Sequence, residues 1–141
     1  MADFQVHILA ADHTLYEGPC QSLVVPALRG QYGILAHHSN TVCGIVPGRL
    51  TYRTPDGTEQ VLAVSSGLVK MEDNDVLVLV DSAERPEEID TNRAERAVAE
   101  AKEAMLQKKT VQEYKMAQAH LARAINRLRV KRSFRPYSGF Q

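Results

Sequence analysis

The sequence predicts an α+β protein, in which an N-terminal β-sandwich precedes a C-terminal antiparallel hairpin of two helices. Two observations predict this fold class. Apolar residues alternate with polar ones as far as residue 86, and they recur at helical spacing beyond it. The charge changes at nearly the same place: residues 1–88 carry 5 Lys and Arg against 12 Asp and Glu, and residues 89–141 carry 12 against 5. We therefore divide the chain into a sandwich domain, 1–86, and a hairpin domain with a basic tail, 87–141.

Short strands separated by turn signals account for the first domain. Residues 4–8 alternate between apolar and polar, which is the period of a strand. A chain break is expected at Glu17-Gly18-Pro19, where glycine and proline occur together. Tight turns are expected at Thr54–Gly57 (TPDG) and at Glu72–Asp75 (EDND), each of which separates two apolar segments. Strands of this length, with no helical stretch among them, are typical of a β-sandwich or a flattened barrel.

The second domain carries two amphipathic helices joined by a short connection near Lys108–Lys109. Thr110, with Glu113 three residues later, predicts a capping box where the second helix begins. The apolar positions at helical spacing are mostly alanine: Ala94, Ala97, Val98, Ala101, Ala104 and Met105, then Tyr114, Ala117, Leu121, Ala124, Ile125 and Leu128. Because alanine buries little area, at roughly 25 cal/mol per Å², we expect the two helices to hold each other only weakly.

Nothing in the sequence predicts a catalytic or metal site. His37 and His38 are adjacent, so in an extended chain they point to opposite faces and do not share one metal ion. No thiol or carboxylate stands near them at the spacing of a zinc site. The GxSxG nucleophile pattern and the GxxxxGK[ST] phosphate loop are both absent, and the VSSG at Val64–Gly67 lacks the strand-turn-helix context of a nucleophile.

The basic end of the second helix suggests nucleic acid as one partner, but two observations oppose this. Cations near a helix C-terminus also stabilise the helix dipole. Aromatic residues that could stack on bases do not occur beside them until Phe134 and Tyr137. We expect no nucleic-acid partner. Since no apolar run approaches about 18 residues, we also expect no direct membrane span.

Four segments resemble the epsilon subunits of bacterial F-type ATP synthases. The segment GQYGILAHHSNTVCGIVPG, residues 30–48, is similar to the pattern GE-aromatic-GILPGHAPLVTALKPG of that family. VSSGLVKMEDNDVLVLVDSAE, residues 64–84, is similar to SGG…V…N.V.VLAD.AE. IDTNRA, residues 89–94, matches the pattern [IL]DxxRA, and LARAINRLRV, residues 121–130, resembles the end of the second helix. The four segments occur in the family's order, and the resemblance as a whole extends over about nine-tenths of the chain.

The resemblance implies a non-catalytic subunit of the central stalk with a sandwich of about ten strands. Such a subunit helps to couple proton or sodium translocation to ATP synthesis, and it is peripheral at the cytoplasmic face of the bacterial cell membrane. The sandwich is expected to bind the gamma subunit and the rotor ring of c subunits. The contact residues that the resemblance implies are Gly30, Tyr32, Gly33, Ile34, Leu35 and His38. The chain departs from the family pattern at Gln31, Ala36, His37, Ser39 and Asn40.

For the hairpin, the resemblance implies regulation. It either folds against the sandwich or extends into the catalytic head of alpha and beta subunits, where it inhibits ATP hydrolysis. The basic face expected to meet acidic segments of the head is formed by Arg123, Arg127, Arg129, Lys131 and Arg132. A weakly packed hairpin suits such a two-state element, since the two states must differ by only a few kcal/mol.

The resemblance also implies a regulatory ATP that is bound and not hydrolysed, and no other cofactor. The residues that match the family's ATP site are Glu84, Asp90, Arg93, Ala94, Arg123 and Arg127. Arg123 and Arg127 are four residues apart on one helix face and could clamp phosphates, and an antiparallel hairpin should bring them beside Arg93. Asp90 would equally serve as an N-cap. Glu100 stands where tight binders have an arginine, so we expect weak binding.

Two other functions compete with this one. The chain could be a free-standing adaptor with a sandwich and a mobile helical arm, or a small β-sandwich enzyme that uses His37 or His38.

Overall fold

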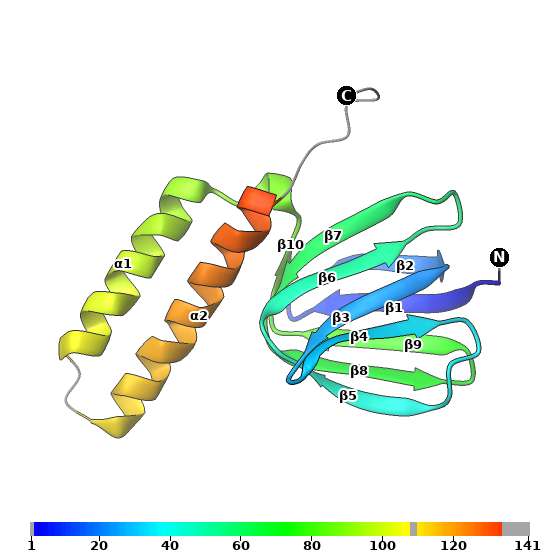
Figure 1. The fold of residues 1–141 in the computed structure, drawn as a ribbon, viewed down its shortest axis with the longest axis horizontal. Coiled ribbons are helices and arrows are strands. Elements are labelled where there is room, and N and C mark those ends of the chain that lie inside the picture. The colour runs from blue at the N-terminus through cyan, green and yellow to red at the C-terminus, as the bar shows by residue number, and fades with distance from the viewer. Residues whose placement is uncertain (1, 108–109, 134–141) are drawn as a thin grey trace. The chain divides into compact units, whose positions relative to one another are not determined.

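The computed structural model describes residues 2–107 and 110–133, which form two compact units divided between Arg85 and Pro86 (Figure 1). The boundary expected from the sequence, between residues 86 and 87, lies one residue after this division. The first unit contains the strands and the second contains the helices. None of the described helices is long and apolar enough to cross a membrane.

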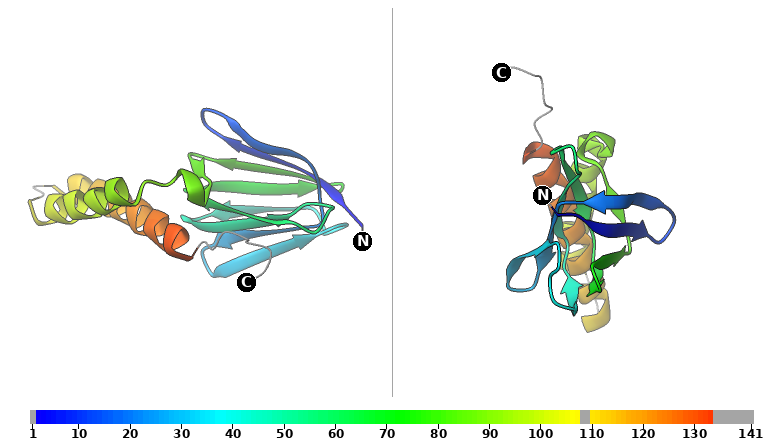
Figure 2. Two further views of the ribbon diagram at one scale, coloured as in Figure 1. Left: turned by 90° about the horizontal axis from the view of Figure 1, so that it is seen from above. Right: turned by 90° about the vertical axis from the view of Figure 1, so that its right-hand side faces the viewer.

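The first unit is a β-sandwich of ten described strands in two five-stranded sheets, which Figure 2 shows as separate layers. The strands are β1 (Phe4–Ala10), β2 (Thr14–Cys20), β3 (Ser22–Ala27), β4 (Gly30–Leu35), β5 (Thr41–Ile45), β6 (Gly48–Arg53), β7 (Glu59–Val64), β8 (Gly67–Glu72), β9 (Asp75–Val80) and β10 (Ala83–Glu84). One sheet has the order β2-β1-β9-β8-β5, and the other has the order β10-β7-β6-β3-β4. The predicted fold class, with its sandwich of about ten strands, is confirmed.

The pairing within the sheets is antiparallel except between β1 and β9, which run parallel with Gln5 opposite Asp75. The core lies between the two sheets, because alternate residues of each strand point inward. Its largest fully buried side chains include Phe4, Ile8, Leu23, Leu50, Tyr52, Leu62 and Met71. The predicted alternation of residues 4–8 is confirmed.

The two tight turns lie where the sequence predicts them. In the turn between β6 and β7, Gly57 N donates to Thr54 O at 2.9 Å, and Asp56 accepts hydrogen bonds from the Thr54 hydroxyl and from Thr58 N. The turn between β8 and β9 consists of Asp73 and Asn74, whose φ angles are 50° and 64°. Positive φ at both central residues is the geometry of a two-residue hairpin, and asparagine adopts it more readily than most residues.

The chain break expected at Glu17-Gly18-Pro19 was wrong. These residues belong to β2, where Gly18 faces Val6 and Pro19 faces Gln5 of β1. Proline cannot donate to a second neighbouring strand. It is tolerated here because β2 is an edge strand that pairs with β1 alone.

The second unit begins with a short 3-10 helix, η1 (Pro86–Glu88), followed by α1 (Thr91–Gln107) and α2 (Val111–Ser133). Each α-helix begins after a capping residue: Asp90 Oδ1 accepts from Arg93 N at 3.2 Å, and Thr110 Oγ1 accepts from Glu113 N at 3.0 Å. The start of the second helix at a Thr110 cap is thus confirmed. The predicted connection at Lys108–Lys109 lies outside the described residues.

The two helices lie side by side in Figure 1, and most of the residues that they bury belong to the predicted alanine stripe. Its buried members are Ala94, Ala101, Ala117, Ala124 and Leu128. Ala104 is an exception, because it is exposed. Three residues of helix turn by about 300°, so Ala104 falls about 60° to the side of Ala101 and leaves the buried stripe.

Candidate docking edge and hairpin site

The segment that resembles the rotor-binding region lies at one edge of the sandwich. β4 pairs only with β3 and is the last strand of its sheet, and β5 pairs only with β8 and is the last strand of the other sheet. The loop of residues 36–40 joins these two edge strands. We call β4 and this loop the docking edge. Such an edge leaves backbone groups and side chains accessible to a partner.

The side chains of β4 alternate between core and surface. Ile34 is 1% exposed and belongs to the core, so it supports the strand from within. Leu35, the next residue, is 61% exposed. Gly30 and Gly33 are also exposed, and Tyr32 is half-buried. Apart from Ile34, the expected contact residues of β4 are thus at least partly accessible.

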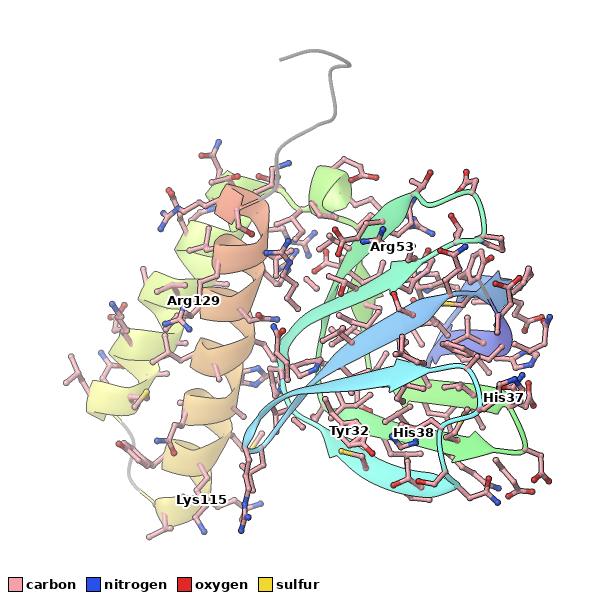
Figure 3. The ribbon with its side chains drawn as sticks, turned by 45° about the vertical axis from the view of Figure 1, so that its right-hand side comes forward. Tyr32, His37, His38, Arg53, Lys115 and Arg129 are labelled. Carbon is pink, nitrogen blue, oxygen red and sulfur yellow. The ribbon has the colours of Figure 1, made fainter. Side chains whose placement is uncertain are left out.

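Tyr32 and His38 form a pair at the docking edge, and Figure 3 shows their side chains next to each other. The Tyr32 hydroxyl and His38 Nε2 are 2.9 Å apart, and the two rings meet edge to face with centroids 5.5 Å apart. His38 Nδ1 lies 2.7 Å from the carbonyl oxygen of Ser39. Because a carbonyl only accepts, Nδ1 carries the proton in the neutral imidazole and Nε2 accepts from the tyrosine. The pair thereby fixes the orientation of His38.

His37 has different partners from His38. Its side chain is exposed, its φ is 65°, and its backbone N donates to Asn74 Oδ1 at 2.7 Å. Within residues 2–107 and 110–133, no three His, Cys, Asp or Glu side chains gather as metal ligands do.

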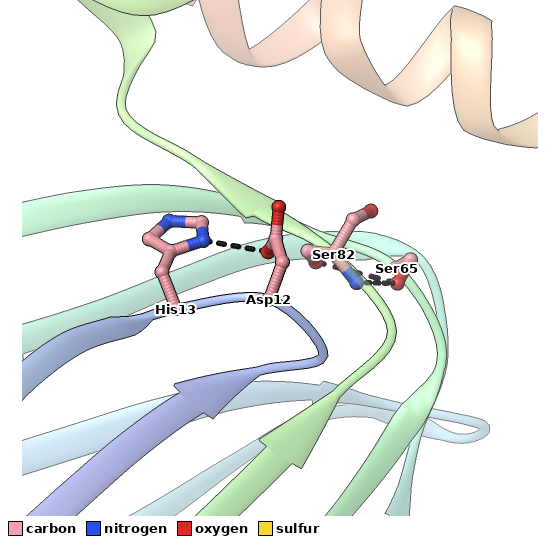
Figure 4. Close-up of polar contacts among 4 residues, drawn as sticks. All are labelled: Asp12, His13, Ser65 and Ser82. Carbon is pink, nitrogen blue, oxygen red and sulfur yellow. Dashed lines mark hydrogen bonds and ion pairs between the residues drawn. The ribbon is translucent and has the colours of Figure 1, made fainter.

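The first serine of VSSG, Ser65, has a structural role. Ser65 is buried, and its hydroxyl lies 3.3 Å from Ser82 O while it accepts from Ser82 N at 2.8 Å (Figure 4). Gly67 lies directly against the carbonyl of Leu79, so that a Cβ there would collide with β9. Asp12 and His13, which Figure 4 also shows, are exposed and hydrogen-bonded to each other. The hydroxyl of Ser65 is thus occupied by backbone groups of Ser82.

The basic end of α2 is tied to the start of the second unit. Lys131 Nζ donates to Pro86 O at 3.0 Å, and Arg132 forms an ion pair with Glu95 at 3.4 Å. Both contacts place the end of α2 beside the beginning of α1, so the helices are antiparallel. Because the Arg132–Glu95 pair is more than half exposed, it contributes at most about 1 kcal/mol.

The other members of the expected basic face differ in their surroundings. Arg123 lies 2.6 Å from the Nδ1 of His120, one turn earlier on α2. Arg129 is exposed, and Arg127 is half-buried with a partner of its own. Arg129 and Arg132 also line an open groove between α1 and α2, together with Glu95, Val98, Ile125 and Leu128.

The residues expected to bind ATP are only partly brought together. Asp90, Arg93 and Ala94 lie at the N-terminus of α1, where Asp90 caps the helix and Ala94 is buried. Glu84 lies on β10, in the first unit. Arg132 pairs with Glu95 near the start of α1. At a rise of 1.5 Å per residue, Arg127 lies about 7.5 Å and Arg123 about 13.5 Å from Arg132 along the helix axis, away from the start of α1. Arg127 is therefore roughly level with Glu100, and the convergence on Arg93 is partial.

The fold and these sites define a class of protein: a β-sandwich with an accessible loop edge, followed by a two-helix arm. Two family models cover this arrangement in order. The model described as ATP synthase, Delta/Epsilon chain, beta-sandwich domain matches residues 3–86, and the one described as ATP synthase, Delta/Epsilon chain, long alpha-helix domain matches residues 87–132. The chain belongs to the ATP synthase delta/epsilon chain family.

Curated relatives agree with this family at the level of the epsilon chain, which confirms the resemblance found in the sequence. The chain is 35% identical to the ATP synthase epsilon chain of Thioalkalivibrio sulfidiphilus over 136 residues, which cover 96% of each chain. It is 37% identical to the ATP synthase epsilon chain of Shouchella clausii over 130 residues, which cover 92% of this chain and 96% of the relative.

Two solved structures share the fold. A chain of the Euglena gracilis mitochondrial ATP synthase, described as OSCP/F1/c-ring, matches with a TM-score of 0.75 at 23% identity and covers 86% of this chain and 77% of its own length. A chain of the Tetrahymena thermophila mitochondrial ATP synthase, described as central stalk/c-ring, matches with a TM-score of 0.70 at 12% identity, covering 90% and 95%. At these identities the likeness concerns the fold.

Proposed function

We propose that the chain is a non-catalytic epsilon subunit in the central stalk of a bacterial F-type ATP synthase, peripheral at the cytoplasmic face of the cell membrane. The observation that carries this proposal is the match to epsilon chains over nearly the whole length of both partners. The subunit would help to couple proton or sodium translocation to ATP synthesis. Copurification tests it: the tagged chain should bring down the gamma, alpha and beta subunits of its own genome. Recovery without them would favour a free-standing adaptor.

The docking edge is the surface that we assign to the gamma subunit and the c-ring. Its support is an exposed leucine on an edge strand, next to a histidine whose orientation is fixed. Leu35→Asp should weaken binding to purified gamma by at least about tenfold, because a charge would replace an apolar contact. Gln60→Asp on β7, a charge in the same sheet away from the edge, serves as the control. An equal loss of affinity in both variants would indicate that gamma binds another surface of the sandwich.

For the hairpin we propose inhibition of ATP hydrolysis through its basic face. The support is a charge of opposite sign from that of the sandwich and a stripe of alanines that holds the helices weakly. Removing residues from Ile89 onward should raise ATP hydrolysis by the reconstituted complex without abolishing assembly. Unchanged hydrolysis across a range of ATP concentrations would exclude an inhibitory hairpin.

Regulatory binding of ATP is the most detailed part of the proposal. The carboxylate of Glu100, which is roughly level with Arg127, would repel the phosphates of ATP. We therefore expect weak ATP binding, in the millimolar range. Glu100→Arg should tighten binding by about tenfold, measured by amide NMR shifts during titration with ATP. Glu103→Arg adds the same charge at another position of α1 and serves as the control. NMR shifts confined to residues outside Glu84–Ala94 and Arg123–Arg127, no shifts at millimolar ATP, or equal gains of affinity in both variants would reject this site.

A further inference from the structure

The turn between β8 and β9 is bonded to the docking edge by side chains. Asn74 Oδ1 accepts from His37 N at 2.7 Å, and Asn74 Nδ2 donates to Asp3 O at 3.0 Å. The backbone carbonyl of Asn74 also accepts from Gln5 N at 3.2 Å. One asparagine therefore joins three separate parts of the sandwich: the loop of the docking edge, the N-terminal segment and its own turn.

A second asparagine makes the return bond. Asn40, the last residue of the loop, accepts from Asp73 N through its Oδ1 at 3.0 Å. The loop is thus held near its start by Asn74 and at its end by the backbone of Asp73. The bonds span 37 and 33 residues of sequence, so they fix the loop to a distant part of the chain rather than to its own strands.

The held segment contains a strained residue. His38 N donates to Leu35 O at 3.2 Å, which closes a four-residue turn with His37 at its third position. The φ of His37 is 65°, in the left-handed region that glycine adopts freely and that only a few per cent of other residues occupy. Such a conformation persists only where its surroundings impose it. Besides the bond that closes the turn, His37 is held by the bond from its backbone N to Asn74 Oδ1.

We propose that Asn74 is a positioning residue of the docking edge: it holds the turn from Leu35 to His38 and thereby sets the Tyr32–His38 pair for the partner. This inference rests on the proposed function of the edge. It assigns no contact with the partner to Asn74 itself. The side-chain amide acts through His37, the residue next to His38.

The test uses three variants of the full chain. Asn74→Gly removes the side chain and tolerates the positive φ, so the turn itself stays unstrained. Asn74→Asp keeps the oxygen that accepts from His37. Asp73→Gly is the matched control, since it removes a neighbouring side chain of the same turn and keeps the backbone N that donates to Asn40.

In the isolated chain, Asn74→Gly should shift the amide signals of residues 35–40 and the ring signals of His38, with the melting temperature nearly unchanged. Its affinity for purified gamma should fall roughly three- to tenfold, mainly through faster dissociation. Asn74→Asp should retain most of the affinity, and Asp73→Gly should retain all of it.

Two outcomes would overturn the inference: loop signals that stay in place in Asn74→Gly, or an equal loss of affinity in Asp73→Gly. If the wild-type chain does not bind gamma while the loop signals still move in Asn74→Gly alone, the positioning by Asn74 stands and the docking function fails.

Discussion

The sandwich and the hairpin are stabilised by different kinds of side chain. The sandwich buries large residues such as Phe4, Leu50 and Leu62 between two sheets, whereas the hairpin joins its helices mainly through alanines. Burial of a leucine side chain contributes roughly 1.5–3 kcal/mol, and an alanine contributes far less. The comparison teaches that one chain can combine a sandwich with a large apolar core and a helical hairpin that buries little apolar area.

Separating the two units should have the largest effect. We expect residues 1–86 to fold alone and unfold cooperatively, because their core is self-contained. Residues 87–133 alone should lose most of their helix signal, since short helices without a substantial apolar face are marginal in water. Circular dichroism of both fragments during thermal unfolding measures this. A hairpin fragment that unfolds as cooperatively as the sandwich fragment would contradict the expected difference in stability between the two units.

Truncating a core leucine should have the second-largest effect on stability. Leu62→Ala should lower the free energy of unfolding of the sandwich by about 2–5 kcal/mol, because it leaves a cavity between the sheets. Urea denaturation of the full chain measures the loss. Leu106→Ala, at an 85% exposed position, is the control and should change stability little.

A change in the alanine stripe should be smaller. Ala101→Gly should weaken α1 by about 1 kcal/mol through helix propensity, with a small addition from lost packing. Ala99→Gly, at an exposed position of the same helix, carries the propensity cost alone. Amide hydrogen exchange within α1 compares the two. A much larger loss at Ala101 would mean that the stripe holds the helices more tightly than its composition predicts.

The smallest effect should come from the turn between β6 and β7. Hydrogen bonds from the Thr54 hydroxyl and from Thr58 lower the pKa of Asp56 below its ordinary value of 3.8. A lowered pKa means that the ionised carboxylate stabilises the folded state above pH 3.8, and that this contribution disappears as the pH falls through the folded value. The melting temperature of Asp56→Asn should therefore lie slightly below that of the wild type at neutral pH. A difference that persists in acid would contradict this cause.

The two-part order, the tight turns and both helix caps could be predicted because each depends on residues close in sequence. Thr110 caps the helix that begins one residue later, and Asp56 closes its own turn. The strand at Pro19 could not be predicted in this way, because proline is acceptable only after the strand is known to lie at an edge.

The candidate site was less accessible to sequence reasoning. The resemblance pointed to His38 and to the segment around it, but not to its link with Asn74, 37 residues from His37. The residues EDND predicted only a turn, since nothing local indicates that an asparagine side chain in it serves another loop. Likewise, the short connection near Lys108–Lys109 predicts an antiparallel hairpin, whereas the position of Arg127 along α1 follows only from the ion pair between Arg132 and Glu95.

The parallel pairing of β1 with β9 has a consequence for the order in which the protein assembles. β1 is synthesised first, but one of its two neighbours, β9, begins 71 residues after it, at Asp75. Contacts between distant parts of a chain form slowly because the loop between them must close first. During translation, β1 and β2 therefore wait as an unfinished edge until β9 leaves the ribosome. β9 emerges before the helices do, so the sheet is able to close before the hairpin is added.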